Sequence, residues 1–476
     1  MRRHSQRRLG WGPAAALLAG VLGTTLVPAV PAFAVHGAVP GDFNGDGYRD
    51  AVLPAPGATV AGKRGAGAVV VLYGASTGLS PTRRKTYTQN SANVPSSAEA
   101  GDGFGETTAT ADLNRDGYAD LVVAAPFEDT AEGQDHGLVA VLWGSRSGLV
   151  SATELPSPDR WQQYYGTDLA VAAGGAGQKT QLMVGGLSSA SLFLGPFSRT
   201  GTFGSVEMED DTASPSSVTL GDFNGDTYPE PVVVTVRLSG QSGGSVYLRP
   251  DYFHEPLPGD GLIAASGDVN GDGHADLVVG DPDEPAKPAD GALGGRVLVW
   301  YGAAGGIKYD AKPVAITQNS AGVPGTSERG DSFGGALAVA DLNRDGLADI
   351  IVGTPSEGVA GRNRSGEVTV IPGRRTGAPG PGAYSFNQWT AGVGGGNESD
   401  DMFGTTVAAG DVNNDGKPEL LVSASGENNH TGAVWVFTGG TSGPVAKGSR
   451  VITAANVNLT QPDSTMLGGY GLLRHI

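Results

Sequence analysis

The stretch Asp268-Val269-Asn270-Gly271-Asp272-Gly273-His274-Ala275-Asp276 decides the fold of this chain, because the chain repeats its pattern. Side-chain oxygens stand at the first, third, fifth and ninth positions of the motif, and glycine stands at the sixth. Alternate oxygens converge on one point only if the backbone wraps tightly around it, and glycine permits that wrap because it takes a positive φ at little cost. The motif therefore predicts a tight loop lined with oxygen donors.

The motif occurs six times in one register. The copies span residues 42–50, 112–120, 222–230, 268–276, 341–349 and 411–419. One match would be weak evidence because Asp-Gly turns are common, and the simplest alternative is a polar turn without a metal. Turns do not require a third and a fourth side-chain oxygen, however, so six matches in register favour a ligand-binding loop.

Hard oxygen donors with three carboxylates are typical of Ca²⁺ sites. We expect up to six Ca²⁺ ions, each held by the side chains at positions one, three, five and nine and by the backbone carbonyl at position seven. The predicted metal ligands are Asp42, Asn44, Asp46, Tyr48 and Asp50; Asp112, Asn114, Asp116, Tyr118 and Asp120; Asp222, Asn224, Asp226, Tyr228 and Glu230; Asp268, Asn270, Asp272, His274 and Asp276; Asp341, Asn343, Asp345, Leu347 and Asp349; and Asp411, Asn413, Asp415, Lys417 and Glu419.

Two structures could contain such a loop. An EF-hand needs a bidentate Glu at position twelve, but that position holds Leu or Val in all six copies, so the EF-hand is excluded. Short β-branched runs follow the loops instead, such as Ile350-Ile351-Val352, and these predict buried strands. The loops are therefore expected at β-hairpins.

The N-terminus has the features of an export signal. A basic start with four Arg is followed by an apolar run from about residue 14 to residue 30, and Ala32-Phe33-Ala34 is typical of a cleavage site. The alternative is a membrane anchor, but the run is short and is interrupted by Gly, Thr and Pro. We expect a signal peptide at residues 1–34, a single domain at residues 35–476, and a secreted, extracellular protein without a membrane anchor.

The composition is acidic and contains no cysteine. Asp and Glu number 49 against 31 Lys and Arg, which gives a net charge of −18. Much of this acidity is assigned to the loops, and a negative surface argues against nucleic acid as a partner. A chain of this length can bury a sufficient core without disulfides, and we expect a monomer.

A seventh repeat lacks the motif. Residues 165–172 and 182–186 match residues 333–340 and 350–353, but residues 174–181 between them contain no carboxylate. Each of the seven repeats carries a second strand pattern, and units of this length with several strands indicate radial blades. The sequence therefore predicts an all-β fold, a seven-bladed β-propeller with calcium-binding loops.

The repeats resemble the FG-GAP family. Phe104-Gly105, Phe333-Gly334 and Phe403-Gly404 each lie eight residues before a loop, and Ala124-Ala125-Pro126 and Gly353-Thr354-Pro355 follow two of the loops. These elements are similar to the FG-GAP repeats of integrin α subunits. The resemblance implies a calcium-binding propeller, although calcium occupies only some blades in that family.

Three departures from the family pattern stand out. The first repeat begins without its Phe-Gly element, and Ser214 and Asp260 stand where Phe is expected in the fourth and fifth repeats. Thr227 replaces the glycine at position six of its loop, where a β-branched residue would be strained.

The resemblance implies a binding platform for an extracellular protein or glycan. The seven His are not spaced as a metal or catalytic pair, and neither HExxH nor GxSxG occurs, so no catalytic constellation is recognised. The alternative is a polysaccharide-active enzyme, a lyase or glycoside hydrolase, whose acid pair is hidden among the paired carboxylates.

A tripeptide and two tryptophans could have either a binding role or a structural role. Arg329-Gly330-Asp331 spells a known adhesive tripeptide, but Gly101-Asp102 holds the same place in another repeat, so repeat architecture is favoured. Trp161 and Trp389 lie in linkers and are candidates for ligand contact, with packing between blades as the alternative.

The C-terminal segment extends beyond the seventh repeat. Leu467-Gly468 resembles a Phe-Gly element, and we expect the segment to return to the first blade and to supply what that blade lacks. The alternative is a disordered tail. Met466, Leu467, Leu472 and Leu473 would be costly to expose, which favours closure.

Overall fold

The computed structural model describes residues 40–174, 177–209, 214–237, 240–248, 255–284, 291–459 and 464–471. All of them belong to one compact unit, Pro31–Ile476. The predicted signal peptide at residues 1–34 and the apolar pair Leu472-Leu473 lie outside the described residues. Within the described residues, no helix is both long enough and apolar enough to cross a lipid bilayer.

The described residues form seven antiparallel sheets, each of four strands. The first three blades contain β1 (Pro40–Gly41), β2 (Asp50–Ala55), β3 (Ala68–Leu72) and β4 (Arg84–Tyr87); β5 (Thr108–Ala111), β6 (Asp120–Ala125), β7 (Leu138–Trp143) and β8 (Ser151–Glu154); and β9 (Leu169–Ala172), β10 (Gln181–Gly185), β11 (Ala190–Leu194) and β12 (Ser205–Glu209).

The remaining four blades continue in the same way. They contain β13 (Pro215–Gly221), β14 (Glu230–Thr235), β15 (Gly244–Leu248) and β16 (Asp260–Gly261); β17 (Ile263–Gly267), β18 (Asp276–Asp281), β19 (Arg296–Trp300) and β20 (Val314–Ile316); β21 (Ala336–Ala340), β22 (Asp349–Thr354), β23 (Glu367–Ile371) and β24 (Tyr384–Phe386); and β25 (Phe403–Gly410), β26 (Glu419–Ala424), β27 (Ala433–Thr438) and β28 (Val445–Thr453).

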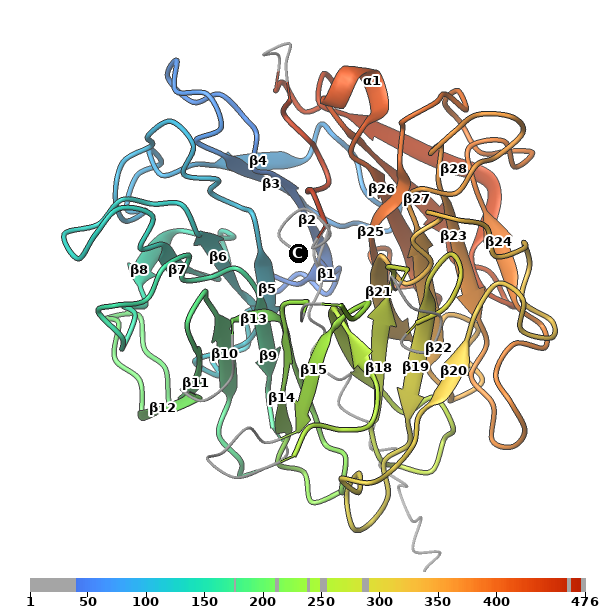
Figure 1. The fold of residues 1–476 in the computed structure, drawn as a ribbon. Coiled ribbons are helices and arrows are strands. Elements are labelled where there is room, and N and C mark those ends of the chain that lie inside the picture. The colour runs from blue at the N-terminus through green and yellow to red at the C-terminus, as the bar shows by residue number, and fades with distance from the viewer. Residues whose placement is uncertain are drawn as a thin grey trace, which may run out of the picture. The chain divides into compact units, whose positions relative to one another are not determined.

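The sheets are blades of a propeller with the first strand of each blade innermost (Figure 1). The innermost strands contact one another in the order β1, β5, β9, β13, β17, β21 and β25, and β25 contacts β1 again. This arrangement confirms the predicted all-β, seven-bladed propeller. The blade without a loop motif, β9 to β12, is present as predicted from its strand pattern.

Buried side chains on both faces of the sheets hold the blades together. Strands β6 and β22 are buried along their whole length, as their β-branched runs predict. The aromatic residue of the Phe-Gly element is also buried, as in Phe104, Phe333 and Phe403. Tyr165, which takes this place in the third blade, is 1% exposed. The repeats therefore bury both a strand core and an aromatic anchor.

One short helical segment, α1 (Glu427–His430), lies between β26 and β27. The sequence shows no helical periodicity, and the segment is a single turn in which Asn428 and Asn429 have positive φ values of 53° and 59°. Asn tolerates this conformation better than most residues. The turn is therefore a local feature of one loop and does not alter the fold class.

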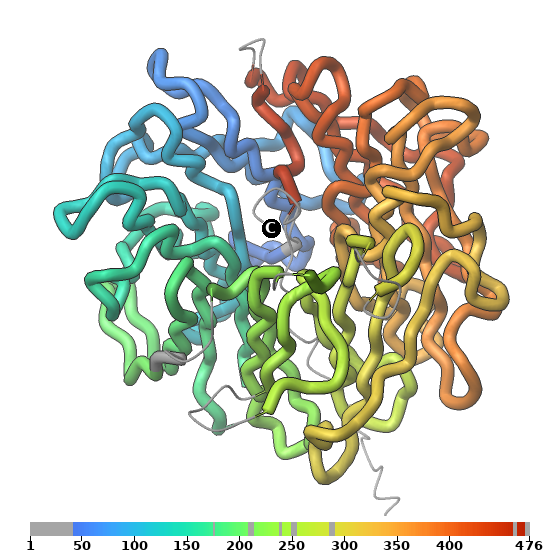
Figure 2. Tube along the Cα trace, viewed as in Figure 1, coloured from blue at the N-terminus to red at the C-terminus, as the bar shows by residue number. Residues whose placement is uncertain are grey.

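The C-terminal segment closes the first blade. Leu467 is fully buried, and its N–H donates to the Thr431 carbonyl at 2.9 Å. The Gly468 N–H donates to the Pro54 carbonyl of β2 at 2.7 Å, as Gly105 N–H donates to the Ala124 carbonyl of β6 at 2.9 Å. Figure 2 shows this red trace beside the blue first blade. The closure predicted from Leu467-Gly468 is confirmed for residues 464–471.

At the start of the fifth blade, charged side chains occupy the place of the aromatic residue of the Phe-Gly element. Arg296 donates to Asp260 at 2.6 Å and to the buried Asp281 at 2.8 Å. Burial raises the pKa of Asp281 to about 7, and the Arg296 charge opposes that rise. An ion-paired triad therefore occupies the junction where the sequence shows Asp260 in place of Phe.

Candidate metal centres

Each of the six motifs lies between the first and second strands of a blade, as predicted. The last residue of each motif begins the second strand, for example Asp120 in β6 and Asp349 in β22. At position six, Gly47 and Gly273 have φ values of 89° and 90°. This positive φ turns the backbone back on itself and brings alternate side chains to one side of the loop.

Two hydrogen bonds recur in all six loops: the amide oxygen at position three accepts from the N–H of position five, and the carboxylate at position five accepts from the N–H of position seven. In the loop at Asp268, the Asn270 amide oxygen accepts from the Asp272 N–H at 2.8 Å, and Asp272 accepts from the His274 N–H at 3.0 Å. Asp268 accepts from Asp272 and Gly273 at 3.1 and 2.9 Å. The motif side chains therefore cap the backbone of their own turn, and each carboxylate oxygen retains a further lone pair.

The carboxylate at position nine anchors the loop to its blade. Asp276 accepts from the Val269 N–H at 2.9 Å and from the Gly302 N–H, at the end of the third strand, at 2.9 Å. The equivalent pair of bonds is present for Asp50, Asp120, Asp349 and Glu419. Position nine is thus buried and rigid.

Negative charge accumulates within each loop. Burial raises the pKa of Asp276 to about 7, and the carboxylates of Asp268 and Asp272 raise it further, against two backbone hydrogen bonds. The same causes raise the pKa to about 7 for Asp50, Asp120, Asp349 and Glu419. The carboxylates of one loop therefore face one another closely enough to repel.

The carboxylates do not converge fully. Among the described residues, no three His, Cys, Asp or Glu side chains meet around a common point as in a complete metal site. The donor set still fits a hard divalent cation, because three carboxylates and an amide oxygen lie on one short turn. The members of each predicted ligand set thus lie on one loop. The fit of each set to Ca²⁺ is supported by the chemistry and charge of its donors.

The loop at Asp222 differs from the other five. Thr227 adopts a φ of 71°, the conformation that glycine takes elsewhere. The Asp222 Oδ1 atom is buried and accepts no hydrogen bond, whereas the corresponding oxygen in the other copies accepts from position five. This loop therefore combines backbone strain with an unsatisfied carboxylate oxygen.

Cationic side chains contact several loops. Arg199 of the third blade pairs with Asp116 at 2.8 Å. Burial acts to raise the pKa of Asp116, but hydrogen bonds from Arg199, Tyr118 and Asn114 hold it below the usual value. Within two other loops, Lys417 lies 3.7 Å from Asp415 and His274 lies 3.0 Å from Asp272. The cations Arg199 and Lys417 partly offset the loop charge at position five.

The adhesive tripeptide is part of the repeat architecture. Asp331 is 4% exposed and accepts a hydrogen bond from the Glu328 N–H at 2.6 Å. Asp102 has the corresponding bond with the Glu99 N–H. Arg329 pairs with Glu284. Because Asp331 is buried, the tripeptide cannot present both of its charges to a partner.

The two linker tryptophans lie at the surface. Trp161 is 76% exposed and Trp389 is 71% exposed, while Trp143, Trp300 and Trp435 are buried on strands. The Arg160 guanidinium lies 4.8 Å from the centre of the Trp161 ring. Packing between blades is therefore excluded for these two side chains, and ligand contact stays a prediction.

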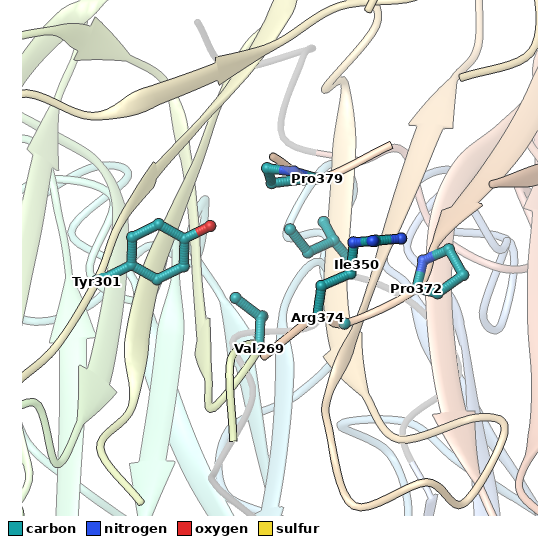
Figure 3. Close-up of a pocket in the computed structure, with 7 residues that line it drawn as sticks. Val269, Tyr301, Ile350, Pro372, Arg374 and Pro379 are labelled. Carbon is teal, nitrogen blue, oxygen red and sulfur yellow. The ribbon is translucent and has the colours of Figure 1, made fainter. Parts of the chain in front are cut away.

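Two cavities occur among the described residues near the loops. The first, of about 10 Å³, lies between Val269, Tyr301, Ile350 and Arg374 (Figure 3) and has room for one water at most. The second, of about 350 Å³, lies beside the strained fourth-blade loop and is lined by Asn224, Asp226, Ile307 and Tyr309. The lining of the second cavity also includes Glu230, so this cavity has two acids, Asp226 and Glu230, and both are predicted calcium ligands.

Sequence reasoning missed a second recurring arrangement. In three repeats, a Gln side chain donates a hydrogen bond to an equivalent Glu. The pairs are Gln89–Glu128, Gln318–Glu357 and Gln388–Glu427. The separation is 39 residues in all three pairs. That shared spacing is visible in the sequence and could have revealed the pairs.

A family model of the FG-GAP repeat matches six segments of the chain. They are residues 34–72, 104–142, 214–248, 261–300, 333–371 and 403–437. The third blade falls outside these matches, although its four strands are present.

Curated relatives are similar over part of their length. A mouse phosphatidylinositol-glycan-specific phospholipase D is 33% identical over 180 residues, 37% of this chain and 20% of the relative. Mouse integrin alpha-IIb is 31% identical over 223 residues, 44% of this chain and 20% of the relative. The match thus spans about a fifth of the length of these relatives.

A solved structure is also similar at low identity. The crystal structure of the exotype rhamnogalacturonan lyase YesX aligns with a TM-score of 0.42 and 12% identity, covering 86% of this chain and 72% of that one. This score is too low to assign a shared fold, so the similarity does not favour a lyase activity for this chain.

Proposed function

This chain is an FG-GAP repeat protein whose repeats resemble those of the integrin α propeller, and we propose that it is a secreted, calcium-stabilised module that binds a protein or glycan outside the cell. The observation that carries the calcium part is the recurrence of one charged loop in six blades. In each copy, carboxylates at positions one, five and nine share a single turn.

Calcium would act on the loops by balancing charge. The raised pKa of Asp276 reflects burial together with repulsion from Asp268 and Asp272. A bound dication would offset that repulsion and would draw the carboxylates together. The buried Asp222 Oδ1 atom, which lacks a hydrogen-bond partner, is an oxygen that such an ion would satisfy.

Calorimetric titration with Ca²⁺ tests the loop assignment. We expect up to six loop sites in the metal-depleted protein, and one fewer in a variant with Asp268→Asn and Asp272→Asn. A matched control changes two exposed acids outside the loops, Glu132→Gln and Asp310→Asn. Equal site numbers in the loop variant and the control would refute calcium binding by that loop.

The binding face is expected to be the one that carries the linkers. In an antiparallel four-stranded blade, the loops between strands one and two lie at the opposite edge from the linkers that enter the next blade. Trp161 and Trp389 are exposed in two such linkers. Exposed aromatic side chains stack on sugars and anchor protein partners, so these two supply contact area.

Glycan arrays and pull-downs with the mature protein test the binding role. A Trp161→Ala, Trp389→Ala double variant should lose most of any ligand captured by the wild type. The control is Leu293→Ala, which truncates an exposed apolar residue elsewhere. If the double variant binds as well as the control, the linker tryptophans are not the contact site.

Secretion rests on the N-terminal pattern of residues 1–34. Expression of the full chain with recovery from the culture medium, followed by N-terminal sequencing, tests it. We expect a mature terminus at Val35. Retention of the uncleaved chain in the membrane fraction would show that the segment is an anchor.

A further inference from the structure

Three linkers carry the same buried polar cluster. The Gln89 Nε2 atom donates to Glu128 Oε2 at 2.5 Å, and the equivalent bonds from Gln318 and Gln388 measure 2.6 Å. Each Gln follows the outermost strand of one blade, and each Glu lies just after the second strand of the next blade. Each cluster therefore joins a linker to the blade that the linker enters.

A second carboxylate belongs to each cluster. Asp102, Asp331 and Asp401 are 3 to 4% exposed, and each accepts a backbone N–H from the Glu three residues earlier. Burial raises the pKa of Glu427, and the charge of Asp401 raises it further. The same two causes act on Glu128 with Asp102 and on Glu357 with Asp331. In every cluster, two buried carboxylates thus lie near enough for the charge of the Asp to raise the pKa of the Glu.

The glutamine of each cluster has an oxygen with no partner. Gln89, Gln318 and Gln388 are 1, 2 and 4% exposed, and the Oε1 atom of each is buried and accepts no hydrogen bond. The amide nitrogen of the same group bonds the cluster Glu, so the amide lies within the cluster. Leaving a buried acceptor unsatisfied is costly, and three equivalent cases beside paired carboxylates indicate that each oxygen lacks a donor or a cation.

The third blade supplies the natural comparison. Gln162 stands in its linker, but no carboxylate pair accompanies it. The Gln162 Oε1 atom accepts from the Ser188 N–H at 3.2 Å and from the Ser188 hydroxyl at 2.5 Å, and its Nε2 atom donates to the Ser189 carbonyl at 2.9 Å. The Gln oxygen is therefore satisfied where the carboxylates are absent and open where they are present.

We propose that each of the three clusters binds a calcium ion through the Gln Oε1 atom and the two carboxylates, as a second class of site on the face opposite the loops. The ligands are Gln89, Asp102 and Glu128; Gln318, Asp331 and Glu357; and Gln388, Asp401 and Glu427. Two carboxylates and an amide oxygen are hard donors, and water completes the coordination of Ca²⁺ in weak sites. No three His, Cys, Asp or Glu side chains meet among the described residues, so the proposed site has two carboxylates and takes the Gln amide as its third protein ligand.

The proposed ion would fix the linker. It would link three parts of the chain: the start of the linker, at Gln; the Asp two residues before the aromatic-glycine element; and the blade, at Glu. This binding is independent of the loop sites, because the two sets share no residue.

The test is a calcium count in a variant that keeps the shape of the clusters. In Glu128→Gln, Glu357→Gln, Glu427→Gln, each carboxylate becomes an amide of equal size. Equilibrium dialysis with radioactive Ca²⁺ should show three fewer bound ions than the wild type. The control makes the same charge change at exposed acids, Glu132→Gln, Glu154→Gln and Asp310→Asn, and should keep the wild-type number.

A second variant protects the test against misfolding. Asp102→Asn, Asp331→Asn, Asp401→Asn keeps an acceptor for the neighbouring N–H and should also lose three ions. If the loops fail to bind, the wild type should still bind three ions and both variants none, so the two proposals fail separately. Equal numbers of bound calcium ions in the wild type and both variants would overturn this inference. Variants that change the pH dependence of the melting temperature but lose no calcium would also overturn it, because the clusters would then bind only protons.

Discussion

The third and sixth blades have the same four-stranded architecture but different junctions. The sixth blade has a carboxylate loop at one edge and a Gln-Asp-Glu cluster at the other, whereas the third blade has neither. In the third blade, Asp168 instead bonds the fourth blade directly, accepting from Ser217 Oγ at 2.8 Å and from the Val218 N–H at 2.7 Å. The difference shows that a blade with a strand core and the buried aromatic Tyr165 forms without a carboxylate loop or a Gln-Asp-Glu cluster.

We expect calcium removal to cause the largest loss of stability, and to affect the blades with carboxylate loops more than the third blade. Without the EF-hand Glu, each loop should bind with a Kd of about 10⁻⁴ M. At ten times that concentration, each ion adds about 1.4 kcal/mol, and six independent ions add about 8 kcal/mol. For a domain of this size, excess EDTA should lower the melting temperature by about 10 °C.

Hydrogen exchange in EDTA gives the matched control for that prediction. Amides of β21 and β22, which flank a carboxylate loop, should lose more protection than amides of β9 and β10, which do not. If metal removal is confirmed and the melting temperature is unchanged, stabilisation by calcium is ruled out.

Removal of the closing segment tests the first blade in the same way. Deletion of residues 464–476 removes the buried Leu467 and the hydrogen bonds to the Pro54 carbonyl of β2 and to the Thr431 carbonyl, so we expect a loss of about 2–5 kcal/mol and association of the truncated protein. Urea denaturation and light scattering measure these two effects. Leu467→Ala in the full chain should lose about 2–5 kcal/mol as well.

The control for closure is Leu293→Ala, because Leu293 is 49% exposed. It should change stability by less than about 0.5 kcal/mol. A truncated protein that stays monomeric with wild-type stability would show that residues 464–476 do not contribute to closure.

Asp168→Asn sharpens the comparison at the third blade. Asp168 Oδ2 accepts from the Val218 N–H and Asp168 Oδ1 accepts from the Leu169 N–H at 2.7 Å, so either orientation of the Asn amide sets its nitrogen against a backbone donor. We therefore expect a loss of about 2 kcal/mol in the free energy of unfolding. The loss should be the same with and without calcium, because no predicted metal ligand is involved. Glu154→Gln, an exposed change in the second blade, serves as the control. Wild-type stability for Asp168→Asn would mean that this junction does not depend on its carboxylate.

The smallest expected effect concerns the weakest loop. Thr227→Gly removes about 1–2 kcal/mol of strain at a φ of 71° and should tighten calcium binding by the loop at Asp222 by about ten-fold. Calorimetric titration of a protein with its other five loops disabled would isolate this site. Gly273→Thr in the loop at Asp268 is the reverse change and should weaken binding there. If both variants bind calcium with unchanged affinity, the backbone conformation at position six does not determine calcium affinity.

The sequence by itself determined the seven blades, the hairpin position of each loop and the closure by Leu467-Gly468. These features depend on local patterns: a nine-residue motif, short β-branched runs and an aromatic-glycine element. Each pattern acts over a few residues, and its repetition in register made the assignment secure even for the third blade, which has strands but no motif.

Only the tertiary structure decided which side chains meet across the blades. The Asp260–Arg296–Asp281 triad and the contact of Asp168 with Ser217 join residues that lie 15 to 49 positions apart, with no repeated spacing to reveal them. Burial of Asp331, which removes the adhesive tripeptide from consideration, was likewise invisible in the residue letters. The physical reason is that burial and charge pairing depend on how neighbouring blades pack, and local sequence carries no direct record of that packing.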